Sequence, residues 1–136
     1  MNIREHTDAV IESLENLGLT VGDAVAPAGA SPPYVTVYPI PGGGTSGTLG
    51  DPDADVSLIY QVTCTGVSRE QVQWLEDVAR GLLDGIEVSD RKTLRVSLDM
   101  HGGTQRDDQL TPPVFWSTPR FRVFTTPSGE EEESPS

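Results

Sequence analysis

The chain has 136 residues, of which 21 are acidic and 9 are basic, so its formal net charge is −12. This balance argues against wrapping nucleic acid or coating an anionic membrane, because both depend on Lys and Arg beside phosphates. The length predicts a single domain, and a hydrophobic fraction of 35 % predicts a modest core. Because the start is charged and no run of about 20 apolar residues occurs, we expect no membrane span and a protein made and used in a cytoplasm.

Residues 2–17 are expected to form the first helix, which Gly18 ends. Apolar residues recur at helical spacing on one face, and acidic residues occupy the other face. The apolar face consists of Ile3, Val10, Ile11, Leu14 and Leu17, and the acidic face of Glu5, Asp8, Glu12 and Glu15. A short strand is expected at 19–25, followed by a loop that reaches Pro33.

Residues 34–40 (YVTVYPI) are expected to form a strand, since β-branched and aromatic residues dominate them. Pro39 has no N–H group, so it marks an edge of the sheet or the end of the strand. The next segment, from Pro41 to Asp53, reads PGGGTSGTLGDPD and cannot contribute to a core. It is either a flexible connection or a long hairpin arm, and loops of this length are often functional.

The rest of the fold is organised around residues 54–85, which are expected to form a strand, a tight turn and a helix. Apolar and polar residues alternate up to Gly66, as in a strand with one buried face. Ser68 is expected to cap the helix, and Gln71 to complete a capping box. The strand would bury Val56, Leu58, Tyr60, Val62 and Cys64, and the helix Val72, Leu75, Val78, Ala79 and Leu82, with Trp74 beside them. Gly85 is the expected C-cap.

The last third of the chain contains two further expected strands, over residues 93–100 and 120–126. A second long loop is expected at 101–113, and residues 114–116 are expected to pair briefly. In the first strand Leu94, Val96, Leu98 and Met100 would face inward; in the second, Phe121 and Val123 would lie opposite Arg120, Arg122 and Phe124.

This order of elements predicts an α+β fold with a mainly antiparallel sheet of four to five strands. Two helices are expected to pack on one face of the sheet, and the strands to be joined in part by long hairpin loops. Residues 1–126 would form the single domain. Residues 127–136, which include the run Glu130–Glu133, would form a disordered acidic tail.

No pattern in the chain predicts catalysis, a cofactor or a metal site, so we expect a protein that is not an enzyme. The stretch that begins at Gly42 has Thr48 where a phosphate loop needs lysine, and it leads into a strand. The only histidines, His6 and His101, lack partners at metal-ligand spacing and are expected to be exposed polar residues. Cys64, the only cysteine, is expected to be buried as a small hydrophobic side chain.

Arg120 and Arg122 share one face of the last expected strand. They either pair across strands with acidic neighbours or form an exposed basic patch for an acidic partner. In so acidic a chain, a local basic stripe would give head-to-tail self-association an electrostatic complement. Trp74 and Trp116 are expected in the core, although either could anchor an interface.

Three stretches of the sequence, taken together, resemble one protein family. The N-terminal helix ends at Leu17–Gly18 and is followed by PPYVTVYPIPGGG, which opens the glycine-rich segment. The strand, turn and helix DVSLIYQVTCTGVSREQVQWLEDVARGLL come next, and RFRVFTT is similar in placement. Over about Met1 to Thr126, the arrangement resembles the tail terminator proteins of long, flexible-tailed bacteriophages, in particular those of actinobacteria. These are also called tail-to-head joining or minor tail proteins.

The resemblance implies a structural protein of the virion tail or neck that is assembled in the host cytoplasm. It implies a homohexameric ring that caps the tail tube, stops polymerisation of the tube protein and joins the tail to the head-closure (stopper) protein. Genomic DNA would pass through an acidic channel without specific binding, because carboxylates repel phosphates. The expected interface residues are Gly42, Gly43, Gly44, Thr45, Ser46, Leu49, His101, Gln105, Arg106, Arg120 and Arg122.

Two other functions stay open from the sequence. An acidic phage decoy that mimics DNA and inhibits a host DNA-binding enzyme would explain the net charge. However, mimics carry carboxylates in regular surface rows, whereas Glu130–Glu133 lie in the expected tail. Another neck or head-closure subunit would share the ring but not the contact with the tail tube.

Overall fold

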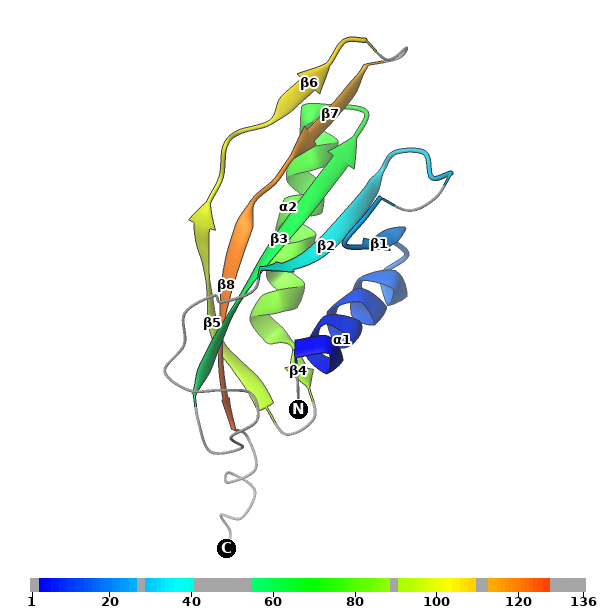
Figure 1. Cartoon of the computed structure of the whole chain (residues 1–136). Coiled ribbons are helices and arrows are strands. Elements are labelled where there is room, and N and C mark those ends of the chain that lie inside the picture. Colours follow the sequence, from blue (N-terminus) through cyan, green and yellow to red (C-terminus); the bar gives the residue numbers. More distant parts are fainter. Residues whose placement is uncertain (1–2, 27–28, 41–54, 89–90, 110–112, 128–136) are drawn as a thin grey trace, which may run out of the picture.

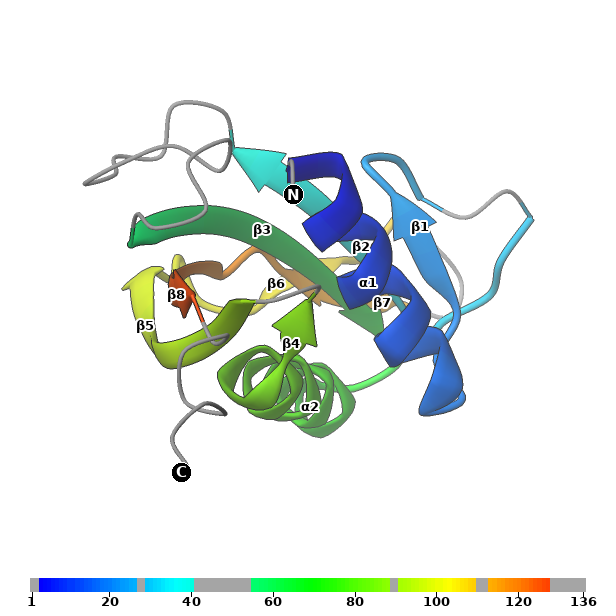
Figure 2. The same cartoon turned by 90° about the horizontal axis from the view of Figure 1, so that it is seen from below.

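Figure 1 shows a computed structural model of the chain, which describes residues 3–26, 29–40, 55–88, 91–109 and 113–127. The expected α+β class is confirmed. Two helices pack against one face of a curled, mostly antiparallel sheet, as the two views in Figures 1 and 2 show. The expected loop at 41–53 and nearly all of the expected tail lie outside the described residues.

The sheet contains more strands than the four to five that the sequence predicts. Its order is β1-β2-β3-β8-β5-β4, and β7 pairs with both β3 and β6. The strands are β1 (Val21–Asp23), β2 (Tyr34–Ile40), β3 (Val56–Gly66), β4 (Glu87–Val88), β5 (Arg91–Met100), β6 (Gln105–Asp107), β7 (Val114–Ser117) and β8 (Arg120–Pro127). The sequence allowed residues 86–90 to be either a link or a very short strand, and β4 is that strand. It missed β6, which is only three residues long and carries no alternating pattern of its own.

Part of the second expected loop is therefore a strand. Gln105 lies opposite Trp116 and Asp107 opposite Val114 in the β6–β7 ladder. The sequence QRD has little tendency to form a strand, so this pairing comes from its tertiary partner and not from local preference. Asp107 does begin a turn, since its Oδ1 accepts the backbone N–H of Gln109 at 3.0 Å.

The helices are α1 (Ile3–Asn16) and α2 (Arg69–Gly85). Ser68 is the N-cap of α2, as expected, and its Oγ accepts the backbone N–H of Gln71 at 3.1 Å. The side-chain oxygen of Gln71 in turn accepts a hydrogen bond of 2.8 Å from the backbone N–H of Val67, the residue before the cap. A Cβ at Gly66 would lie 3.0 Å from the Gln71 Oε1, so a larger residue there would push the Gln71 side chain aside.

Replacing Ser68 with alanine is expected to lower the free energy of unfolding by about 1 kcal/mol, because the Gln71 N–H loses its acceptor. Ser68→Asp keeps a side-chain oxygen at the cap and is expected to stay close to the unsubstituted protein. Urea unfolding followed by circular dichroism measures both variants. Equal stability of the alanine and aspartate variants would show that the cap contributes nothing.

The core lies between β3 and its neighbours on one side and the two helices on the other. The alternation expected in β3 is confirmed, since all five of its expected inward residues are buried. From α2, the fully buried residues are Val72, Leu75, Ala79 and Leu83. Trp74 is 52 % exposed and Trp116 is exposed at the surface of β7, so the prediction that both tryptophans are core residues is wrong. Trp74 lies on α2 one residue before the buried Leu75, outside the buried stripe of the helix, and therefore points outward.

The inward pattern expected for β5 is also wrong in part. Leu94 is 58 % exposed and Met100 is 56 % exposed. The pairing of β5 with β8 shifts register between Thr93 and Arg95 and again between Leu98 and Met100. Val96 and Leu98, between the two shifts, lie opposite the buried Val123 and Phe121 as expected, although Leu98 is 42 % exposed. Leu94 and Met100, which lie at the shifts, depart from the expected pattern.

His6 is buried, which corrects the expectation of an exposed polar residue. Its Nδ1 lies 2.6 Å from the hydroxyl of Tyr60, and that hydroxyl lies 3.1 Å from Oγ1 of Thr7. Thr7 donates to the carbonyl oxygen of Ile3 at 2.8 Å. Burial, together with the positive charge of Arg91, lowers the pKa of His6 to about 4. The cluster fastens α1 to the central strand through polar groups.

Candidate interaction surface

The open face of the sheet is the face that carries no helix. Because side chains alternate along a strand, residues next to the buried ones point to this face. In β3 these are Ile59, Gln61 and Thr63, and in β8 they are Arg120, Arg122 and Phe124, as the sequence predicts. In Figure 1 the sheet lies in front of α2, with β5 and β8 at one side and α1 at the other, and Figure 2 confirms this arrangement.

Four of the nine basic residues of the chain lie on this face, on alternate rungs of the β5–β8 ladder. The rungs pair Lys92 with Thr126, Arg95 with Phe124, Ser97 with Arg122, and Met100 with Arg120. We call the four basic residues, Lys92, Arg95, Arg120 and Arg122, the basic stripe. Successive rungs of the stripe are two residues apart on β8, so the stripe extends over about 20 Å.

The guanidinium groups of the stripe are held in place by neighbours on the same face. The Arg95 guanidinium carbon lies 4.0 Å from the centre of the Phe124 ring, which is a cation–π contact. Arg120 Nε donates to Gln61 Oε1 at 3.2 Å, across from β8 to β3. These contacts reduce the number of side-chain conformations that a binding partner would have to restrict.

Arg122 has the acidic partner that the sequence allowed for. Its Nε donates to Asp99 Oδ2 at 3.0 Å, and its Nη1 lies 3.3 Å from the hydroxyl of Ser57. Arg120, in contrast, donates to the neutral side chain of Gln61, so this contact does not compensate its positive charge. Arg122 is thus partly neutralised within the chain, whereas Arg95 and Arg120 contribute most of the positive potential of the stripe.

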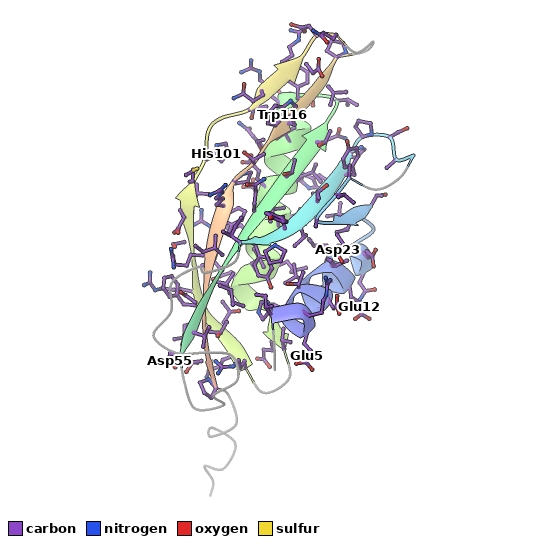
Figure 3. The ribbon with its side chains drawn as sticks, in the orientation of Figure 1. Glu5, Glu12, Asp23, Asp55, His101 and Trp116 are labelled. Atoms are coloured by element: carbon purple, nitrogen blue, oxygen red, sulfur yellow. The ribbon has the colours of Figure 1, made fainter. Side chains whose placement is uncertain are left out.

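Acidic side chains gather at the other side of the molecule, on α1. Glu5, Asp8, Glu12 and Glu15 follow each other at three- and four-residue intervals on the exposed side of the helix, and we call them the acidic row. Figure 3 shows Glu5 and Glu12 here, with Asp23 of β1 beside them, whereas Asp55 and His101 lie toward the opposite side. Arg4 bridges Asp8 and Asp23. Negative charge therefore predominates on the outward side of α1, with Arg4 among the carboxylates, and basic residues predominate on the open face, where Asp99 contacts Arg122.

Three of the expected interface residues, His101, Gln105 and Arg106, lie in the β5–β6 region outside the basic stripe. Each of them makes contacts within the chain. His101 Nε2 lies 2.8 Å from Glu76 Oε2 on α2. The backbone N–H of Gly103 donates to His101 Nδ1 at 2.9 Å, so in the neutral ring Nε2 carries the proton and donates to Glu76. Arg106 stacks over the ring of Phe115 at 5.5 Å and pairs with Asp108. Gln105, the third, pairs with β7 through its backbone.

The sequence did not reveal the cluster of Glu76, His101 and Ser117, because its members come from three separate elements. Ser117 is fully buried, and its hydroxyl donates to the Glu76 oxygen that also contacts His101. In a catalytic triad the histidine lies between serine and carboxylate, whereas here the carboxylate lies between the other two. The arrangement cannot activate the serine as a nucleophile, and it attaches the segment after β5 to α2.

The cysteine and the possible metal-ligating side chains of the described residues are two further kinds of group that could support chemistry. Cys64 is buried as expected, and burial raises the pKa of its thiol, which keeps it unreactive. Among the residues that the structure describes, no three His, Cys, Asp or Glu side chains gather where they could share a metal ion. Within the same part of the chain, no helix has the length and apolar character needed to cross a bilayer.

The expected interface residues Gly42, Gly43, Gly44, Thr45, Ser46 and Leu49 lie outside the described residues. Of the others, Arg120 and Arg122 share the open face, while His101, Gln105 and Arg106 belong to the β5–β6–β7 region. Comparison with models of known protein families finds no match for this chain. Comparison with curated proteins finds no match either.

Proposed function

We propose that this chain is the ring-forming subunit of a phage tail terminator. One observation supports the proposal most directly: the basic stripe and the acidic row lie at different sides of one molecule. Each copy can therefore offer both surfaces to the complementary surfaces of its neighbours. A head-to-tail contact of this kind closes into a ring when the rotation between copies allows it.

In this role the ring caps the tail tube, ends polymerisation of the tube protein and offers a surface to the head-closure protein. With a net charge of −12 on each copy, the channel repels the phosphates of the genome, so DNA passes without specific binding. The function consists of assembly alone, and we propose no catalytic step.

The second candidate, a decoy that mimics DNA, is favoured by the acidic row itself. Carboxylates at regular intervals along α1 could imitate a row of phosphates. A decoy has no use for the basic stripe, which would repel the basic groove of a DNA-binding enzyme. We therefore prefer the ring.

Native mass spectrometry of the purified chain, at low and at moderate salt, is expected to show a six-fold species. Addition of purified tail tubes is expected to place the ring at the tube end and to stop further addition of tube protein. A chain that stays monomeric, does not bind tubes and instead inhibits a purified host nuclease in a salt-sensitive manner would support the decoy and refute the ring.

A further inference from the structure

The charges on the open face of the sheet determine what kind of partner can bind there. Arg95 is exposed, and Arg120, two open-face rungs further along the stripe, is partly exposed. Two exposed apolar side chains, Tyr38 on β2 and Met100 on β5, lie on the rung of Arg120 and so border one end of the stripe. A partner for this surface needs a row of negative charges about 15 to 20 Å long, because the stripe itself extends over about 20 Å. It also needs an apolar group near one end of that row.

The outward side of α1 has these properties. From Glu5 to Glu15 the acidic row extends over about 15 Å, at 1.5 Å per residue. Its carboxylates follow at intervals of about 4.5 to 6 Å, close to the spacing of about 6.6 Å between successive rungs of the stripe. Ile3 and Leu17, at the two ends of α1, are both exposed. The row and the stripe thus have the same number of charged members at similar spacing, and each has an exposed apolar side chain at an end. Asp8 of the row and Arg122 of the stripe already have a partner within their own chain.

We propose that the basic stripe of one copy binds the acidic row on α1 of a second copy, and that this is the contact which repeats around the ring. The inference rests on the proposed function. Within one chain the contact cannot form, because α1 packs against β1, β2, β4 and α2 while the stripe lies on β5 and β8. The two surfaces are different, so the contact is heterologous, and it closes into a ring when the rotation between copies allows it.

The charge of the whole chain favours carboxylates of another copy over the phosphates of nucleic acid. Three of the four members of the stripe are arginines, whose planar guanidinium groups donate bidentate hydrogen bonds to carboxylates and phosphates alike. Nucleic acid would meet the same groups, but it would also approach a chain of net charge −12. Another copy of the chain presents an acidic row together with its own basic stripe, so each new contact is compensated locally.

Two charge-reversal variants test the contact, and each is expected to fold because the substituted residues lie at the surface. Arg95→Glu with Arg120→Glu makes the stripe negative, and Glu12→Arg with Glu15→Arg makes the row positive. Each variant alone would bring like charges together, and we expect at least a tenfold loss of self-association in sedimentation velocity and native mass measurements. Circular dichroism and thermal unfolding check that both remain folded.

An equimolar mixture of the two variants is expected to assemble again. The negative stripe of one variant then meets the positive row of the other, and the unchanged stripe of the second meets the unchanged row of the first. A ring with an even number of subunits can alternate the two variants all the way around. Rescue in the mixture, without assembly of either variant alone, is a result that unfolding or altered net charge cannot produce.

The matched controls reverse the same number of charges on α2. Arg69→Glu with Arg80→Glu and Asp77→Arg with Asp84→Arg alter net charge equally but touch neither surface, so assembly is expected to be unchanged. If the unsubstituted chain forms rings or caps tail tubes and the stripe and row variants do so equally well, the proposed contact is wrong while the proposed function stands. If the unsubstituted chain does neither, both are wrong. If Arg95→Glu with Arg120→Glu abolishes retention of a DNA duplex and leaves assembly intact, the stripe binds nucleic acid instead.

Discussion

Replacement of Leu75 by alanine is expected to lower the free energy of unfolding by about 2 to 5 kcal/mol, the usual cost of emptying a fully buried leucine site. Leu75 has no exposed surface and lies on the side of α2 that packs against β3. The backbone of α2 cannot collapse into the space, because the neighbouring core residues of α2 and β3 hold it at its distance from the sheet.

The matched control is the preceding residue, Trp74, which is larger but 52 % exposed. Trp74→Ala is expected to change the free energy of unfolding by less than about 1 kcal/mol, in line with surface substitutions. Urea unfolding of both variants gives the comparison. Greater destabilisation by Trp74→Ala than by Leu75→Ala would mean that α2 is rotated relative to the orientation described here.

Local patterns in the sequence were sufficient to predict the central strand, both helices and the N-cap of α2. The alternation in β3 and the capping residues Ser68 and Gln71 act over a few neighbouring positions, so the sequence itself reports them. The prediction failed where a long-range partner decides the structure. The two register shifts of β5 exist only in its ladder with β8, and they decide that Leu94 and Met100 face outward.

For the same reason, only part of the candidate interaction surface could be predicted from the sequence. Arg120 and Arg122 are two residues apart on one strand, so their common face follows from alternation. Lys92 and Arg95 join them because of the register of β5 on β8, which no local pattern encodes. The segregation of the stripe from α1 is a property of the sheet order, and a count of charges in the sequence does not contain it.

The burial of His6 was missed because histidine was assigned to the polar side of its helix. Its position four residues before Val10 and eight before Leu14 places all three on one helical face. The signal was therefore present, but it required treating histidine as a candidate for burial. Tyr60, on the buried side of β3, supplies the hydrogen-bonding partner that makes this burial tolerable.

Acidification from pH 7 to pH 5 is expected to lower the free energy of unfolding by about 2 kcal/mol through His6 alone. The pKa of His6 is about 4 in the folded chain, against 6.5 for an ordinary histidine. Because the folded pKa is the lower one, the unfolded chain takes up the proton first. This stabilisation is complete above pH 6.5 and is lost as the pH falls toward 4, which makes about 3 kcal/mol in total.

Urea unfolding at pH 7, 6 and 5 measures this loss in a range that lies above the titration of ordinary carboxylates. In His6→Gln, the fall in the free energy of unfolding between pH 7 and pH 5 is expected to disappear, whatever the substitution costs in stability at pH 7. His101→Gln removes the other histidine and is expected to keep the slope, which assigns it to the buried site. An unchanged slope in His6→Gln would show that His6 does not titrate as a buried group. Because His6 and Tyr60 fasten α1 to the sheet, and α1 carries the acidic row, the same acidification is expected to weaken self-association in parallel with stability.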